Sequence, residues 1–284
     1  MVADGAEPPT FIELGPAVPA SPVVLAVPHA GRAYPAALLA GSRLPAATLD
    51  LLADRHVDRL IGGSVATGAT AIVAALPRAW IDLNRDPREV DPAMIEPPPQ
   101  RDRLISTAKV RGGLGLIPRR ITGHGEIWFR PLSPEALAQR VEGTHLPYHR
   151  AIAAAAARAQ ARYGIAFILD VHSMPPLGGS TPARVVVGDR NGSTAGRSTR
   201  DLVVAHAREL GPVALNDPYA GGYTLERHGR PHRGIHAVQI EFDRDLYLAT
   251  DGGLDDAGVL ALSNWLCRLV AQLGTAASPA IAAE

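Results

Sequence analysis

Ionisable side chains follow several apolar stretches of this sequence, at the positions where buried strands are expected to end. In open α/β sheets, ligand sites lie beyond the carboxyl ends of the strands. The repeated coincidence of an apolar run and a polar cluster therefore predicts one functional site along this edge of a sheet. The clusters are His29, residues 82–85, residues 170–172, Asp189 with Arg190, and Glu241.

Three of these side chains have the chemistry of metal ligands. His29 and His172 each follow an apolar run, and Asp54 lies on a helix expected between them. A hydrolytic zinc site takes three ligands from histidine and carboxylate side chains and leaves a fourth position for water. The three residues are therefore candidate ligands of one Zn²⁺ ion. Asp170 would share the strand face of His172 and could hydrogen-bond to it.

Each candidate ligand also has a structural interpretation. His29 could be a turn residue bonded to the backbone of a Pro-His-Ala-Gly loop, because a single histidine says little about function. Asp54 could be a solvated helix charge among neighbouring arginines. His56 is a competing ligand, whereas Asp58 is expected at the surface.

Two histidine pairs have the spacing of four residues that places two ligands on one helix face. They are His145 with His149 and His228 with His232. The first pair lacks the glutamate of a metalloprotease helix and contains a proline, and the second contains glycine and proline. Both pairs are poor primary metal sites, but individual members, His228 among them, are expected to line the pocket.

Glu241 is the candidate general base. In residues 236–242, Gln239 and Glu241 share one strand face, and the other face carries mainly apolar side chains. A central parallel strand is normally apolar on both faces, so a carboxylate near its end needs a reason. It could take a proton from metal-bound water and deliver it to a leaving amine. The alternative is an edge strand with this face in solvent.

Asn84, Arg85 and Arg190 are candidate anion binders, because the guanidinium group matches a carboxylate with two parallel hydrogen bonds. Arg85 could instead form an ion pair with one of the nearby aspartates. Gly222, in a glycine pair, indicates a loop whose backbone approaches a ligand closely, although turn geometry alone could also require glycine.

The apolar pattern predicts an α/β fold with a mixed, mostly parallel sheet and helices on both faces. A single domain over residues 21–284 would follow an N-terminal arm or edge segment, residues 1–20. Residues 87–127 show little periodicity, as in a lid or binding loop. Strands are expected at residues 22–28, 70–76, 165–171, 184–188 and 236–242, and helices at 46–67, 133–163 with a kink near 143–147, 194–210 and 254–273.

The composition excludes several classes of protein. The 28 Lys and Arg residues balance the 28 Asp and Glu residues, which argues against nucleic-acid binding. No apolar run is long enough to span a membrane, and the N-terminus does not resemble a secretory signal. A single cysteine, Cys267, favours a reducing compartment, so a cytoplasmic location is expected. Neither a nucleotide-binding motif nor a serine-hydrolase motif is found.

Several sequence blocks, in order, resemble the N-formylglutamate amidohydrolase (deformylase) family, whose members are zinc-dependent hydrolases distantly similar to the carboxypeptidase and aspartoacylase group. Jointly they are specific, although each block is weak alone. The blocks are VPHAGRAYP at 27–35, DRHVDRL at 54–60, IDLNRDPREVDPAM at 81–94, GGLGLIPR at 112–119, PYH at 147–149, LDVHSMP at 169–175, VVGDRNG at 186–192, NDPYAGGYT at 216–224 and HAVQIEFDRDLYL at 236–248.

The resemblance implies a phosphorylase/hydrolase-like fold and assigns roles to the candidate residues. Glu241 would be the base or acid. The carboxypeptidase-like relatives carry their first two ligands as His-x-x-Glu, but Arg32 occupies the position of that glutamate here. The carboxylate ligand must then come from Asp54. The zinc ligands would be His29, Asp54 and His172, and the groups that bind substrate carboxylates would be Asn84, Arg85 and Arg190.

The resulting hypothesis is zinc-dependent hydrolysis of N-formyl-L-glutamate to formate and glutamate. The expected partner is thus a small acidic N-acyl amino acid, with no nucleic acid and no membrane. Two alternatives remain open. One is a sister metallohydrolase that acts on another N-acyl amino acid or amide, and the other is a non-catalytic α/β protein that binds an anion.

Overall fold

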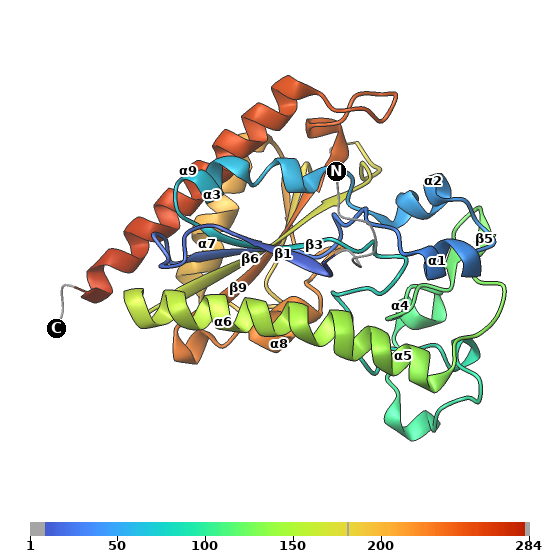
Figure 1. Ribbon diagram of the computed structural model, residues 1–284. Coiled ribbons are helices and arrows are strands. Elements are labelled where there is room, and N and C mark those ends of the chain that lie inside the picture. The colour runs from blue at the N-terminus through green and yellow to red at the C-terminus, as the bar shows by residue number, and fades with distance from the viewer. Residues whose placement is uncertain (1–8, 181, 282–284) are drawn as a thin grey trace, which may run out of the picture. The chain divides into compact units, whose positions relative to one another are not determined.

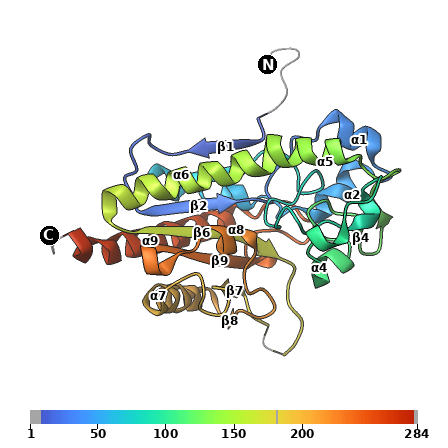
Figure 2. The ribbon, with the colours of Figure 1, turned by 90° about the horizontal axis from the view of Figure 1, so that it is seen from below.

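The computed structural model describes residues 9–180 and 182–281. Within these residues the main sheet has seven strands, in the spatial order β1-β3-β2-β6-β9-β7-β8. Figure 2 shows β2, β6, β9, β7 and β8 in succession. A separate two-stranded sheet joins β4 (Arg120–Ile121) to β5 (Gly125–Glu126). The strands of the main sheet are β1 (Phe11–Leu14), β2 (Val23–Val27), β3 (Thr70–Ala74), β6 (Ala166–Met174), β7 (Val185–Gly188), β8 (Val213–Leu215) and β9 (Ile235–Asp243).

The centre of the sheet is parallel and completely buried. β6 pairs in parallel with both β2 and β9, and every residue of β2 and β6 is buried. β7 pairs with β9 in the antiparallel direction, and β8 is parallel to β7. The predicted mixed, mostly parallel sheet is therefore confirmed.

Helices cover both faces of this sheet (Figure 1). On one face, the Trp265 ring of the last helix meets Phe242 of β9 edge-on at 5.4 Å between centroids. On the other face, the backbone N–H of Gly222, which precedes a short helix, reaches Gln239 of β9. The helices are α1 (Ala36–Gly41), α2 (Ala46–Leu49), α3 (Gly62–Ala66), α4 (Ala108–Arg111), α5 (Pro134–Arg140), α6 (Leu146–Tyr163), α7 (Arg197–Ala207), α8 (Tyr223–His228) and α9 (Asp256–Ile281).

Backbone contacts divide the described chain into two compact units. The first contains residues 9–12, 28–55 and 73–150, and it consists mainly of loops with short helices. The second contains residues 13–27, 56–72 and 151–281, and it holds most of the main sheet with α3 and α7 to α9. The boundary expected after residue 20 stays a prediction, and residues 1–8 of the expected arm lie outside the described residues.

One predicted helix is wrong. Residues 46–67 form α2, two 3₁₀ turns (Asp50–Leu52 and Val57–Arg59) and α3 instead of one continuous helix. His56 has a φ of 58°, in the left-handed region, which interrupts the helical path. Asp54 therefore lies in a loop rather than on a helix. Its backbone N–H donates to the carbonyl oxygen of His29 at 3.0 Å.

The structure differs from the prediction in two further respects, the ends of the predicted elements and several short elements that were not predicted. Ser133 caps α5, and the kink predicted near residue 143 is a π-helical segment, Val141–His145. β6 extends to Met174, so His172 lies within the strand rather than after it. The short strands β1 and β8 carry too few residues to show a periodic pattern. Residues 87–127 form short turns, α4 and the β4–β5 pair.

The loop that carries His29 is packed against the end of β3. The backbone N–H of Ala33 donates to the carbonyl oxygen of Ala75 at 2.9 Å. A Cβ atom added to Gly31 would lie 2.0 Å from the carbonyl oxygen of Leu76, which is too close for any side chain. Glycine at this position is therefore a requirement of backbone packing.

The packing of this loop predicts that Gly31→Ala lowers the free energy of unfolding by about 3 kcal/mol, because backbone must move to accept the methyl group. Urea unfolding followed by circular dichroism measures this change. Gly143→Ala is the matched control, since nothing lies within 4 Å of its added Cβ. A Gly31→Ala variant as stable as the wild type would contradict the packing described here.

Candidate metal centre

His29 is held on both sides by carboxylates. Its Nε2 atom lies 2.7 Å from Oδ1 of Asp82, and its Nδ1 atom lies 3.3 Å from Oδ2 of Asp54. All three side chains are buried. Because an ionised carboxylate only accepts hydrogen bonds, the contact with Asp82 places a proton on Nε2. The Nδ1 atom is then the nitrogen that faces Asp54.

Asp82 is ionised although it is completely buried. Burial alone would raise its pKa, but Arg78, His29 and Arg85 outweigh this effect and hold the pKa well below its ordinary value. Nε of Arg78 donates to Oδ2 at 2.9 Å, and the backbone N–H of Asn84 donates to Oδ1 at 2.9 Å. This carboxylate therefore fixes the ring of His29 and the start of the segment that contains Asn84 and Arg85.

His172 has an equivalent partner on its own strand. Its Nε2 atom lies 3.0 Å from Oδ2 of Asp170, two residues earlier in β6, and both side chains are buried. The predicted contact between Asp170 and His172 is therefore confirmed. A hydrogen bond from Nε2 to this carboxylate leaves Nδ1 as the nitrogen available for a metal ion.

The three predicted metal ligands are close together. Each of His29, Asp54 and His172 offers one ligand atom, and these atoms lie within 4.8 Å of one another. Bond lengths of about 2.0–2.1 Å around a tetrahedral zinc ion place two ligand atoms roughly 3.3 Å apart, which matches the separation between His29 and Asp54. In the part of the chain that the structure describes, this is the one group of three such residues, so neither His56 nor Asp58 belongs to it.

Glu241 lies beside His172 on the neighbouring strand. The two residues are register partners in the parallel pair of β6 and β9, which places their side chains on the same face of the sheet. β9 lies between β6 and β7, so the alternative of a solvent-facing edge strand is wrong. Glu241 is only 8% exposed, and its Oε1 atom accepts a hydrogen bond from Nε2 of Gln239 at 2.8 Å.

Arg85 is oriented by backbone groups. Its Nε atom donates to the carbonyl oxygen of Leu114 at 3.0 Å, and its Nη1 atom donates to that of Asn84 at 2.9 Å. Asp82 is 3.8 Å from the same Nε atom, so the alternative interpretation as an ion pair also has support. The guanidinium group is thus fixed in position, and the role of Asn84 and Arg85 in binding a substrate stays a prediction.

His145 and His149 position this segment, a function that the sequence pattern did not indicate. Both are completely buried, and their rings lie 4.5 Å apart between centroids, tilted by 47°. Nε2 of His145 lies 2.9 Å from the carbonyl oxygen of Arg85, and Nε2 of His149 lies 2.8 Å from that of Leu83. Their spacing of four residues brings the two rings together, and each ring contacts a backbone carbonyl.

β7, the strand that precedes Arg190, runs in the opposite direction to its neighbour β9. Because β7 is antiparallel to β9, its last residue, Gly188, pairs with Gln239 and not with Glu241. Residues 189–190 therefore follow the point where Gly188 pairs with the middle of β9, and not the carboxyl ends of β6 and β9. Arg190 lies 2.9 Å from Glu226 in a partly exposed ion pair. Substrate binding by Arg190, Gly222 and His228, which is buried at the end of α8, stays a prediction.

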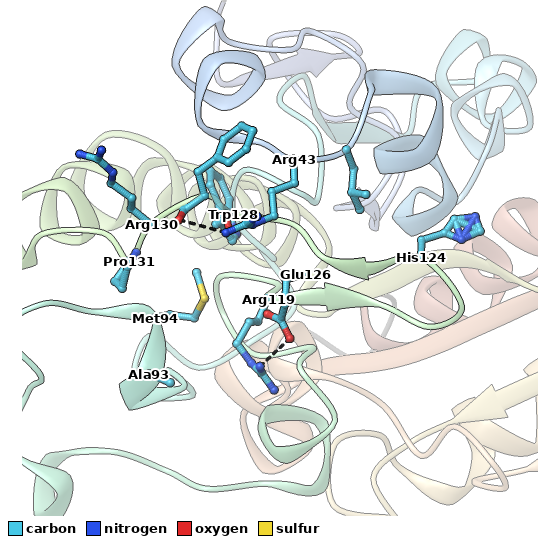
Figure 3. A pocket seen from close by; sticks show the side chains of 11 residues that line it. Arg43, Ala93, Met94, Arg119, His124, Glu126, Trp128, Arg130 and Pro131 are labelled. Carbon is cyan, nitrogen blue, oxygen red and sulfur yellow. Dashed lines mark hydrogen bonds and ion pairs between the residues drawn. The ribbon is translucent and has the colours of Figure 1, made fainter.

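An open hollow of about 500 Å³ lies elsewhere in the first unit (Figure 3). Two of its arginines contact other groups of the protein: Arg119 pairs with Glu126 at 2.7 Å, and Nε of Arg43 donates to the carbonyl oxygen of Trp128 at 2.9 Å. No predicted site residue lines it. The hollow is therefore separate from the candidate metal centre.

The fold is a mostly parallel α/β sheet, and its site combines two histidines and an aspartate that could hold a metal ion with a neighbouring glutamate. This combination fits a hydrolase. The family model for N-formylglutamate amidohydrolase matches residues 21–248. The chain therefore belongs to the N-formylglutamate amidohydrolase family, whose reaction breaks a carbon–nitrogen bond of a linear amide. The resemblance noted in the sequence is confirmed.

Individual relatives agree with this assignment. The N-formylglutamate deformylase of Pseudomonas aeruginosa is 29% identical over 242 residues, which are 80% of this chain and 82% of the relative. A crystal structure of N-formylglutamate amidohydrolase from Ralstonia eutropha superposes with a TM-score of 0.86 at 32% identity, covering 95% of this chain and 99% of that one. A protein from Agrobacterium tumefaciens shares the fold with a TM-score of 0.68 at 19% identity, with 95% of each chain covered. Among the described helices, none has the length and apolar character of a membrane span.

The contacts of Asp82 predict that Asp82→Asn lowers the free energy of unfolding by about 3–5 kcal/mol at pH 7, because buried cationic partners lose their counter-charge. The pKa of Asp82 is lowered in the folded state, so its contribution is present above about pH 4 and decreases as the pH falls further. Urea unfolding of both proteins between pH 3 and pH 8 tests this. The exposed Asp201→Asn should change little, and an equal cost for Asp82→Asn at all pH values would contradict the assignment.

Proposed function

We propose that this chain hydrolyses N-formyl-L-glutamate to formate and glutamate, with one zinc ion held by His29, Asp54 and His172. The observation that carries the proposal is the close approach of these three buried ligand atoms, in a chain related to named N-formylglutamate deformylases. The single cysteine, Cys267, fits a reducing, cytoplasmic location, which is part of the same proposal.

The histidine–aspartate pairs support metal binding through Nδ1 of each histidine. Asp82 and Asp170 accept hydrogen bonds from the Nε2 atoms, which fixes the tautomer and orients each ring. The oxygen of Asp54 completes a donor set of nitrogen and oxygen that suits zinc. A bound zinc ion would supply Lewis acidity toward the formyl carbonyl and a lowered pKa for water.

Glu241 is proposed to move the proton. Its carboxylate accepts a proton from the attacking water and then delivers that proton to the amide nitrogen as the carbon–nitrogen bond breaks. The products are formate and the free amine of glutamate, so the atoms of one water molecule are divided between them. The position of Glu241 beside His172, on a buried central strand, supports this role.

The substrate carboxylates are proposed to bind cationic side chains. Arg85 is the stronger candidate, because its guanidinium group is held by two backbone carbonyls and is mostly buried. Arg190 is a weaker candidate, because it would have to leave its ion pair with Glu226. Asn84, Gly222 and His228 are proposed as further groups that bind the substrate.

We expect the purified protein to release formate from N-formyl-L-glutamate, to lose this activity after dialysis against a chelator, and to regain it with Zn²⁺. A coupled formate dehydrogenase assay measures the rate. A panel of N-formyl and N-acetyl amino acids is the specificity control. Faster turnover of another N-acyl amino acid would show that N-formyl-L-glutamate is not the preferred substrate. A stoichiometric metal ion without any turnover would contradict the proposed reaction.

We expect Glu241→Gln to retain zinc but to lose at least about 100-fold in kcat, because the proton acceptor is removed. His172→Ala should instead lose the metal ion itself, since one of three protein ligands is missing. Atomic absorption on both variants separates the two effects. Full activity in Glu241→Gln would remove this residue from the mechanism.

A further inference from the structure

Gln239 connects Glu241 to the loop before α8. The two side chains lie on the same face of β9, and Gln239 is 4% exposed. We propose that Gln239 is a positioning residue that holds the carboxylate of Glu241 in place, and that Gly222 in turn orients Gln239. This inference rests on the proposed function, in which Glu241 transfers the proton.

The hydrogen bonds determine which way the amide of Gln239 points. The backbone N–H of Gly222 can only donate, and it lies 3.0 Å from Oε1 of Gln239. The NH₂ group of the amide is therefore directed to the other side, where it donates to Oε1 of Glu241 at 2.8 Å. A rotated amide would bring two donors together at Gly222 and two acceptors together at Glu241. Both hydrogen bonds thus run in the same direction, from Gly222 to Gln239 and from Gln239 to Glu241.

Gly222 is itself held by the end of β7. The backbone N–H of Arg190 donates to the carbonyl oxygen of Ala220 at 2.7 Å. A Cβ atom added to Gly188 would lie 2.7 Å from the backbone carbon of Ala220, so the loop packs directly on this strand. Gly221 has a φ of 117°, which glycine adopts without strain. The glycine pair therefore sets the position of the donor that reaches Gln239.

Burying the polar side chains of Gln239 and Glu241 costs free energy, and packing alone gives no reason for this cost. Central strands with both faces covered are normally apolar, and a buried carboxylate requires hydrogen bonds. A donor from the protein restricts the torsions of Glu241, and a displacement of about 1 Å at a reacting group costs on the order of 100-fold in rate. The contact therefore serves the placement of the carboxylate.

The test is Gln239→Met, which removes the amide and keeps the length of the side chain. We expect kcat for N-formyl-L-glutamate to fall 10- to 100-fold, while KM changes less than about threefold and the zinc content stays at the wild-type value. Gln239→Asn is the second variant. Its amide is one carbon shorter and cannot reach Gly222 and Glu241 together, so a loss of kcat is expected even if Gln239→Met folds poorly.

A double-mutant cycle distinguishes positioning from a general structural effect. In the Glu241→Gln background, Gln239→Met should cause no further loss of kcat, because Gln239 acts only through the carboxylate. Gln160→Met is the matched control, since the Gln160 amide donates to the backbone carbonyl of Arg233. Its kcat should equal that of the wild type.

The outcomes separate the two proposals. If the wild type is active and Glu241→Gln is impaired, wild-type kcat in both Gln239 variants would overturn the role of Gln239 alone. A large rise in KM with unchanged kcat, or a full additional loss in the Glu241→Gln background, would also overturn it. If the wild type hydrolyses no N-acyl amino acid, the proposed function fails, and the positioning role fails with it.

Discussion

The hydrogen bond between His29 and Asp82 is the contact on which the rest of the centre depends. Asp82 is a completely buried carboxylate, and such a charge persists only when cations and donors surround it. It is satisfied by Arg78, His29 and the backbone of Asn84. The same group thus orients a candidate metal ligand and the start of a candidate substrate-binding segment, so neither can move independently of the other.

Two different local structures produce the same arrangement of a histidine and an aspartate. In β6 the pair is built from residues two apart on one strand face, which the alternation of a strand guarantees. For His29 the aspartate is 53 residues away, and a packed loop brings it into contact. The first pair could therefore be predicted from the sequence, whereas the second depends on tertiary structure that no local pattern encodes.

The difference between local patterns and tertiary contacts also decides which features could be predicted from the sequence. The buried strands β2, β3, β6, β7 and β9 have apolar runs long enough to be recognised, and the ligand group followed from the ends of those strands and from the family motifs. The helix over residues 46–67 was wrong because its apolar spacing is compatible with a helix, whereas His56 takes a left-handed backbone conformation. The contacts of His145 and His149 could not be predicted, because both rings bind backbone carbonyls, and such contacts have no sequence signature.

The direction of β7 has the largest consequence for the site. A strand's orientation cannot be read from its apolar pattern, so the polar cluster after β7 was expected at the same edge as His172. The antiparallel pairing instead places Gly188 beside Gln239, and the loop through Gly222 then returns to β9 from that side. Glu241 consequently has His172 as its register partner on β6, and it accepts a hydrogen bond from Gln239 of its own strand. A carboxylate that accepts a hydrogen bond from a fixed donor is better placed for proton transfer than one held by its own torsions alone.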